Sequence, residues 1–248
     1  MRDSESMIEG KNAVIEAFRA GTTIDRLFVL ENDKSGPVNT IIREAKKSGV
    51  PVKFVKKQRL DQLSETGAHQ GVIAYISHVE YADIDDILDK AASKNEPPFI
   101  FLLDGIEDPH NLGAIIRTAD ASGAHGVVIT KNRSADVTST VVKASAGAVN
   151  HVAIAKVTNL TDTIEGLKDK GMWFVCADAD GDVMYNLNLT GAIGLVIGNE
   201  GHGVSRLVRE HCDMTASIPM KGQISSLNAS VAAGVLSYEI VRQRSFNE

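Results

Sequence analysis

The chain has 248 residues, of which 43% are hydrophobic and 23% are charged, a composition typical of a soluble globular protein with one or two domains. Its formal net charge of −6 argues mildly against nucleic acid as a partner, and two distant cysteines, Cys176 and Cys212, indicate neither a disulfide framework nor a cysteine metal site. The polar start lacks a signal-peptide core, and no apolar run approaches the roughly 20 residues of a membrane helix, so we expect a cytoplasmic protein.

Residues 1–78 are expected to form one small α/β domain. Apolar spacing of three and four residues indicates its helices, and alternation or short apolar runs indicate its strands. In chain order the predicted elements are a helix over 12–19, a strand over 26–30, a helix over 37–47, a strand over 51–55, a short helix near 60–63 and a strand over 71–76.

This domain carries positive charge although the whole chain is acidic. Residues 1–78 hold 12 Lys/Arg and 10 Asp/Glu, and the stretch 43–59 holds seven basic residues against Glu44 alone. Such a patch can bind phosphates. From charge alone, a solvated face of a helix and its following strand explains it equally well.

Residues 79–98 are charged and end in Pro97-Pro98, which favours a linker, and residues 99–248 follow as a second domain. Alternating elements predict a largely parallel sheet with helices on both faces. The predicted strands are 99–103, 126–130, 153–157, 173–177, 195–197 and 217–219, and the predicted helices are 111–122, 138–146, 161–170, 205–210 and 228–244. Asn111 is the expected N-cap of its helix, and Arg117 lies off that helix's apolar face.

Two glycine-marked loops follow strands of this second domain. Residues 195–197 end in a loop with three glycines within six residues, and the strand-like segment 217–220 leads to a second loop. Loops at strand ends are where open α/β sheets bind ligands, although two ordinary turns would look the same. The sequence has no GxxxxGK[ST], GxGxxG, HExxH or GxSxG motif, and its seven histidines are scattered, so no metal site is indicated.

Three segments of the second domain resemble the signature motifs of the SPOUT methyltransferases, specifically the SpoU branch of RNA ribose 2′-O-methyltransferases. They are NLGAIIRTADASGA (111–124), GLVIGNEGHGVS (194–205) and IPMKGQISSLNASVAAGVLSYE (218–239). The first domain, closed by HQGVIA (69–74), is similar to that branch's L30e-like RNA-binding domain. The resemblance implies an α/β methyltransferase domain threaded into a deep trefoil knot, a rare exception to unknotted chains.

The resemblance also implies a site for S-adenosylmethionine in the knot loops. The residues that match cofactor-contacting motif positions are Gly198, Asn199, Gly203, Ile218, Met220 and Leu227. The implied catalytic residues are Arg117, Asn111, Glu200, Asn228 and Ser226. Arginine is a poor base because its pKa lies above about 12. Arg117 is therefore expected to act either as a strongly perturbed base or as a clamp on the target phosphate and hydroxyl, with Glu200 fixing the arginine or the loop.

The function implied by the resemblance is 2′-O-ribose methylation of RNA, with a guanosine of 23S ribosomal RNA as the target and a homodimer as the working form. A tRNA target is the alternative within the enzyme class. An inactive RNA- or ribosome-binding protein of the same fold is disfavoured because the motif residues are present, and a nucleotide-dependent oxidoreductase is disfavoured because its fingerprint is absent.

Overall fold

The computed structural model describes residues 7–77, 79–223 and 225–245, and the chain divides into two units. The first unit comprises the residues up to Glu80 and the segment Asp136–Ser139, and the second comprises Tyr81–Ala135 and the residues from Thr140 onward. The interval expected as a linker contains helix α4 (Ile84–Ser93), whose Ile87 is fully buried in the core of the second unit. The structure therefore places most of residues 79–98 within the second unit.

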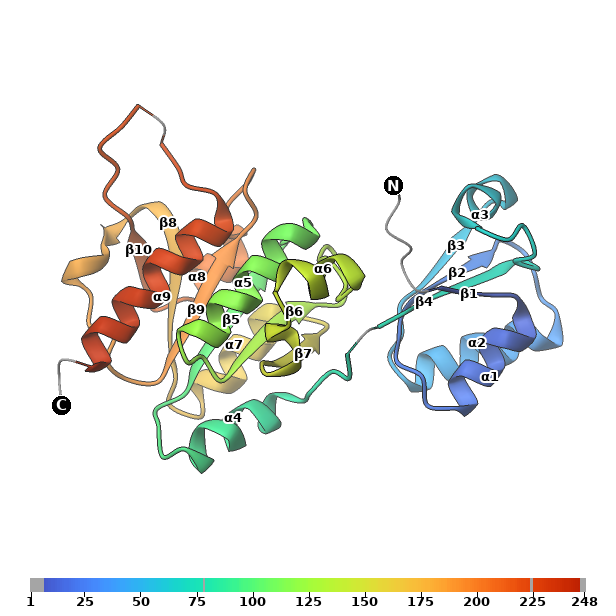
Figure 1. Ribbon diagram of the computed structural model, residues 1–248, viewed down its shortest axis with the longest axis horizontal. Coiled ribbons are helices and arrows are strands. Elements are labelled where there is room, and N and C mark those ends of the chain that lie inside the picture. Colours follow the sequence, from blue (N-terminus) through green and yellow to red (C-terminus); the bar gives the residue numbers. More distant parts are fainter. Residues whose placement is uncertain (1–6, 78, 224, 246–248) are drawn as a thin grey trace. The chain divides into compact units, whose positions relative to one another are not determined.

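The first unit is a four-stranded sheet with helices on both faces (Figure 1). Its strands follow the order β1-β4-β2-β3, with β2 and β3 parallel and the other neighbours antiparallel. Its elements are β1 (Met7–Glu9), α1 (Lys11–Arg19), β2 (Ile24–Leu30), α2 (Gly36–Lys47), β3 (Val52–Val55), α3 (Lys57–Leu63) and β4 (Val72–Ile76). The sequence did not predict β1, because three residues are too short to show alternation.

Two apolar clusters hold the first unit together, one on each face of its sheet. Helices α1 and α2 cover one face, where Val14 and Ile41 pack against Leu27. Helix α3 covers the other face, where Leu60 packs against Phe28. Alternate residues of each strand serve opposite faces, which is the physical basis of this two-sided core.

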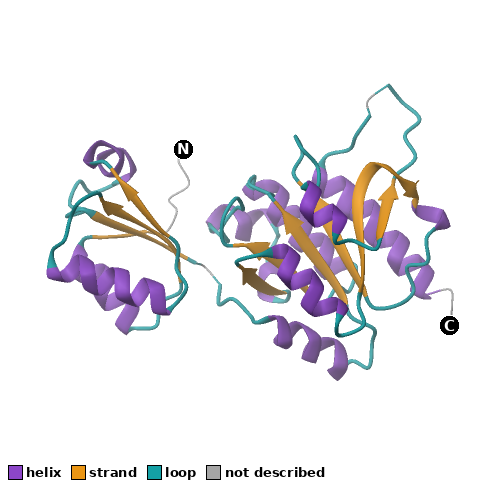
Figure 2. Ribbon diagram, turned by 180° about the vertical axis from the view of Figure 1, so that it is seen from behind, coloured by secondary structure: helices purple, strands orange, loops and turns teal. Residues whose placement is uncertain are grey.

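The second unit is built on a six-stranded parallel sheet in the order β10-β8-β9-β5-β6-β7 (Figure 2). The strands are β5 (Phe99–Asp104), β6 (Gly126–Thr130), β7 (Ala153–Val157), β8 (Trp173–Val183), β9 (Ile193–Gly198) and β10 (Met214–Ser217). The helices besides α4 are α5 (Pro109–Ala121), α6 (Ser139–Ala144), α7 (Leu160–Lys168), α8 (Arg206–Glu210) and α9 (Ala229–Ser245), with short 3-10 turns at Ala148–Asn150 and Met184–Asn186.

Helices cover both faces of this sheet, as a buried parallel sheet requires. Helices α4, α7 and α8 contribute Ile87, Ile164 and Val208 to one cluster against the sheet. Helices α5 and α9 pack against each other, and α9 also contacts β9 and β8. The mixed α/β class, the parallel sheet and the two-part organisation predicted from the sequence are confirmed.

Several predicted boundaries of the second unit were wrong. Helix α5 begins at Pro109 with Asp108 as its N-cap, so Asn111 is a buried residue inside the helix rather than its cap. Strand β8 continues to Val183 because it pairs with β10 beyond an irregularity at Thr215/Ala216. Strand β10 ends at Ser217, where the sequence suggested a strand beginning. The trefoil knot implied by the resemblance stays a prediction. Among the described residues, no helix combines the length and apolarity needed to cross a membrane.

Candidate functional site

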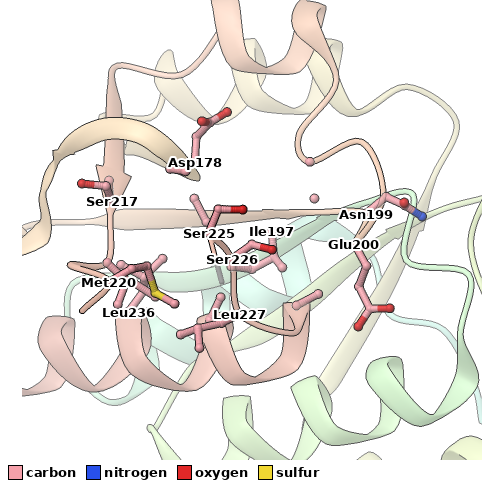
Figure 3. A pocket seen from close by; sticks show the side chains of 18 of the residues that line it. Asp178, Ile197, Asn199, Glu200, Ser217, Met220, Ser225, Ser226, Leu227 and Leu236 are labelled. Carbon is pink, nitrogen blue, oxygen red and sulfur yellow. The ribbon is translucent and has the colours of Figure 1, made fainter. Parts of the chain in front are cut away.

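A cavity of about 570 Å³ lies at the ends of β9 and β10, beside the middle of β8 (Figure 3). Ligands of open α/β sheets bind outside the carboxyl ends of parallel strands, and this volume suits a small-molecule site. The lining comes from the middle of β8, the ends of β9 and β10, the loops that follow these two strands, and one side of α9: residues 177–179, 197–203, 216–220, 225–227, 229, 232 and 236. All six predicted cofactor-contacting residues lie in this lining, as do Glu200 and Ser226.

The loop after β9 is closed on itself by backbone hydrogen bonds. The Asn199 N–H donates to the Gly203 carbonyl at 3.0 Å, and the Gly203 N–H donates back to the Asn199 carbonyl at 2.8 Å. The Asn199 side chain accepts from the Gly201 N–H at 2.7 Å and donates to the Gly105 carbonyl at 2.8 Å. At Gly198 an added Cβ would lie 2.1 Å from the Gly203 carbonyl carbon. Only glycine therefore allows the backbone at position 198 to approach Gly203 so closely. The loop is thus held in one shape before any ligand arrives.

The opposite wall of the cavity is largely apolar. Ile218 and Met220 come from the segment after β10, Leu227 precedes α9, and the fully buried Ile197 lies at the base. Apolar side chains facing loop backbone groups form a surface that suits a flat, partly polar ring system.

Three predicted catalytic residues meet at the cavity's edge. The Asn111 amide donates to a Glu200 carboxylate oxygen at 3.0 Å, and the Asn228 amide donates to Asn111 Oδ1 at 3.0 Å and also to Glu200. Asn228 further accepts from the Ser230 N–H at 2.9 Å, which caps the start of α9. In Figure 3 the Glu200 side chain extends from the glycine loop towards the helices. This cluster ties the glycine loop to both α5 and α9.

Arg117 lies apart from this cluster. It is exposed on α5 and is not among the residues that line the cavity. Within residues 7–77, 79–223 and 225–245, its guanidinium forms no hydrogen bond or ion pair. Glu200 was expected to fix either Arg117 or the loop. In the structure it ties the loop to α5 and α9 and does not contact the arginine. Arg117 is exposed and its guanidinium carries five N–H donors, so an anionic group can reach it.

Sequence reasoning missed Asp178, which lines the cavity at the end of the apolar run of β8. Its carboxylate forms an ion pair with Arg209 at 2.9 Å. A polar residue directly after an apolar strand was the signal that could have identified it. Next to it, a hydrogen bond with Cys212 lowers the pKa of the Cys176 thiol to about 7, and the same contact raises the pKa of Cys212. Among the described residues, no group of three or more His, Cys, Asp or Glu side chains could hold a metal ion.

Comparison with known proteins places both parts of the chain. Residues 98–238 match the model described as the SpoU rRNA Methylase family, and residues 7–82 match the model described as RNA 2′-O ribose methyltransferase substrate binding. A Bacillus subtilis (strain 168) protein, YacO, whose name assigns it to the TrmH family of tRNA/rRNA methyltransferases, is 47% identical over 245 residues and 98% of each chain.

Solved structures agree with this placement. The SpoU methyltransferase AviRb from Streptomyces viridochromogenes, in complex with AdoMet, is 28% identical with a TM-score of 0.61, covering 97% of this chain and 90% of its own. A TrmH/SpoU tRNA modifying enzyme from A. aeolicus is 31% identical with a TM-score of 0.56, covering 61% of this chain and 78% of its own.

Proposed function

The chain belongs to the SpoU rRNA methylase family of RNA methyltransferases, and on that premise we propose that it methylates a ribose 2′-hydroxyl of RNA, with a guanosine of 23S ribosomal RNA as the target. The observation that carries the proposal is the convergence of all six motif-matched residues, from two separate loops, on one cavity. S-adenosylmethionine is the methyl donor of the family and the ligand of its relative AviRb.

The cavity's residues fit that cofactor. Its volume of about 570 Å³ lies within the range of small-molecule sites. Gly198 places no side chain between itself and the nearby backbone of Gly203 and Val204. Ile218 and Leu227 would hold the adenine between apolar surfaces, and the backbone of the loop from Asn199 to Gly203 would hydrogen-bond to its polar atoms. When bound, the cofactor supplies an electrophilic methyl group on a positively charged sulfonium.

Glu200 serves the reaction through charge and position. Its carboxylate lines the cavity and accepts from the amides of Asn111 and Asn228, which hold it in a fixed place. A fixed negative charge favours a cationic ligand over its neutral product. Ser226, which lines the cavity next to Leu227, would hydrogen-bond near the target ribose.

Arg117 would act on the RNA. Its exposed guanidinium has no carboxylate partner within the described residues, so its planar fork is free to hold the phosphate and the 2′-hydroxyl of the target nucleotide. We assign it the clamp role rather than that of the base. A homodimer would bring a second copy's surface towards this helix, and α9, which exposes Val231 and Tyr238, is the candidate contact.

The test is transfer of labelled methyl from S-adenosylmethionine to RNA that lacks modification, with large-subunit ribosomal RNA and bulk tRNA assayed in parallel. The proposal expects label in a ribose of the ribosomal RNA, located by nuclease digestion and nucleoside analysis. Label confined to tRNA would keep the chemistry and replace the substrate; the A. aeolicus relative is named a tRNA modifying enzyme. Label on a base rather than a ribose would refute the proposed reaction.

A further inference from the structure

An exposed phenylalanine stands on the edge strand of the first unit. Strand β3 lies at one end of the sheet order β1-β4-β2-β3 and pairs with β2. The side chain of Phe54 is 54% exposed, whereas Val52 and Val55 on the same strand pack against the two cores. A large exposed aromatic ring on an edge strand favours unwanted association, so its presence calls for a binding role.

Four exposed lysines lie on or just after strands β2 and β3: Lys53 is on β3 but faces the other side of the sheet from the ring, Lys56 and Lys57 follow β3, and Lys34 follows β2. Strands β2 and β3 run in parallel, and their last register pair is Leu30 with Val55, so the segments that follow both strands leave at the same edge. We call Lys34, Lys53, Phe54, Lys56 and Lys57 the β3 edge patch. In the part of the chain that the structure describes, none of these four ammonium groups has a hydrogen-bond or ion-pair partner.

The acidic residues of this edge do not neutralise the patch. Asp33 is held by Lys11 at 2.7 Å, and its hydrogen bonds with Lys11 and Ser35 lower its pKa to about 2. Its charge is thus already paired. Glu31 is the one other carboxylate between β2 and α2, and it is exposed. Four unpaired cations against one exposed carboxylate leave a surface that attracts an anionic polymer.

We propose that the β3 edge patch binds an unpaired segment of the substrate RNA, with one base stacked on the Phe54 ring and the lysines on the flanking phosphates. The proposal rests on the proposed function, because RNA is the substrate there. A base can stack on a protein ring only when it is free of its own helix, so the patch selects looped or single-stranded RNA over duplex. Stacking tolerates any base, so the patch would add affinity and leave sequence choice to other contacts.

The experiment measures binding of the full chain to a fluorescein-labelled oligouridylate of about 12 nucleotides and to a duplex RNA of equal length. Phe54→Ala should raise the Kd for oligouridylate about 5- to 100-fold and change duplex binding less than twofold. Phe54→Tyr should bind like the unmodified protein, and Phe54→Leu should resemble Phe54→Ala because it keeps apolar bulk without a π-face. Lys56→Ala should lower the slope of log K against log salt by about 0.7.

Trp173→Ala is the matched control, since Trp173 is 58% exposed on a strand of the other unit, and it should leave oligouridylate binding unchanged. The double variant Phe54→Trp, Trp173→Phe carries its single tryptophan in the patch, and oligouridylate should quench its fluorescence. Equal binding by Phe54→Ala and the unmodified protein would overturn the proposal. Wild-type binding by Phe54→Leu would also do so, because it would show that RNA binding does not need a π-face at this position.

Failure of this inference and failure of the proposed function look different. Stacking at Phe54 without any methyl transfer would remove the enzymatic function and leave an RNA-binding surface. Methyl transfer with a normal KM for RNA in Phe54→Ala would retain the enzyme and place its RNA contacts elsewhere.

Discussion

Replacing Gly198 by alanine tests whether the closed loop after β9 shapes the proposed cofactor cavity. The new Cβ would lie 2.1 Å from the carbonyl carbon of Gly203 and 2.2 Å from the nitrogen of Val204. Both are backbone atoms, so no side-chain rotation can relieve the contact. Since ordinary van der Waals contact begins at 3.4 Å, the peptide between these residues must move by about 1.3 Å.

A movement of that size is larger than the loop can absorb. The paired hydrogen bonds between Asn199 and Gly203 are 3.0 and 2.8 Å long, and a further 1.3 Å would break them. Overpacking of this kind typically costs about 1–3 kcal/mol, which lowers Tm by roughly 2–12 °C for a domain of this size. Because misplacing a catalytic framework by about 1 Å can cost 100-fold in rate, we expect kcat/KM for methyl transfer to fall about 100-fold.

Calorimetric titration with S-adenosylmethionine, thermal unfolding and methyl transfer together test this prediction. Gly166→Ala is the control, because Gly166 is exposed on α7 and a Cβ there meets nothing within 4 Å. That variant should gain about 0.5–1 kcal/mol of stability and keep the cofactor affinity. Wild-type cofactor affinity in Gly198→Ala would refute the reasoning, since it would show that the cavity does not depend on the loop.

Three further predictions concern side chains that can carry a charge. Arg117→Ala should lower the rate of methyl transfer at least about 100-fold. Its Tm and its Kd for S-adenosylmethionine should stay within error, because the guanidinium has no partner in the described part of the chain. Normal turnover would remove Arg117 from the mechanism. Glu200→Gln keeps one side-chain oxygen as a hydrogen-bond acceptor but loses the charge. Titration should therefore show about fivefold weaker binding of S-adenosylmethionine and unchanged binding of neutral S-adenosylhomocysteine. Equal losses for both ligands would contradict the electrostatic role. Burial lowers the pKa of His125, whose Nδ1 accepts from the Phe99 N–H at 3.0 Å and whose Nε2 lies 3.0 Å from Glu96. The folded state therefore prefers the neutral ring. The stability that this preference contributes is complete above the unfolded pKa of about 6.5 and is lost as the pH falls below it. The Tm of the unmodified protein, measured from about pH 7.5 to 5, should drop more steeply than the Tm of His125→Gln, and parallel curves would disprove the assignment.

The fold class followed from local patterns because a buried parallel sheet leaves a clear signature. Runs such as 99–103 and 195–197 are apolar throughout, and amphipathic stretches separate them, so strands covered on both faces were the consistent solution. The functional family required the motifs, since glycine loops alone fitted ordinary turns equally well.

The errors have physical causes that local reasoning could not see. Asp108-Pro109 starts α5 earlier than Asn111, because proline's fixed φ suits the first helical turn and the aspartate accepts from the His110 N–H. The polar end of β8 is held as a strand by its pairing with β10, which lies more than 30 positions later in the chain. The contacts of Glu200 with Asn111 and Asn228 span 89 and 28 positions, and only the tertiary fold brings such residues together.

The groups proposed to act in the reaction differ in how firmly the structure holds them: Glu200 is fixed by hydrogen bonds, whereas Arg117 has no partner in the described part of the chain. Glu200 is already satisfied by the amides of Asn111 and Asn228, so its carboxylate does not compete for the guanidinium. An arginine paired with that carboxylate would be neutralised before RNA arrived, and the phosphate would have to displace the pair at a cost in affinity. A long cationic side chain without a partner instead gains its fixed orientation only when the phosphate of the target nucleotide, or a surface from a second copy, meets it. On the proposed function, one chain would supply the whole cofactor site, and Arg117 would take a fixed orientation when RNA or a second copy meets it.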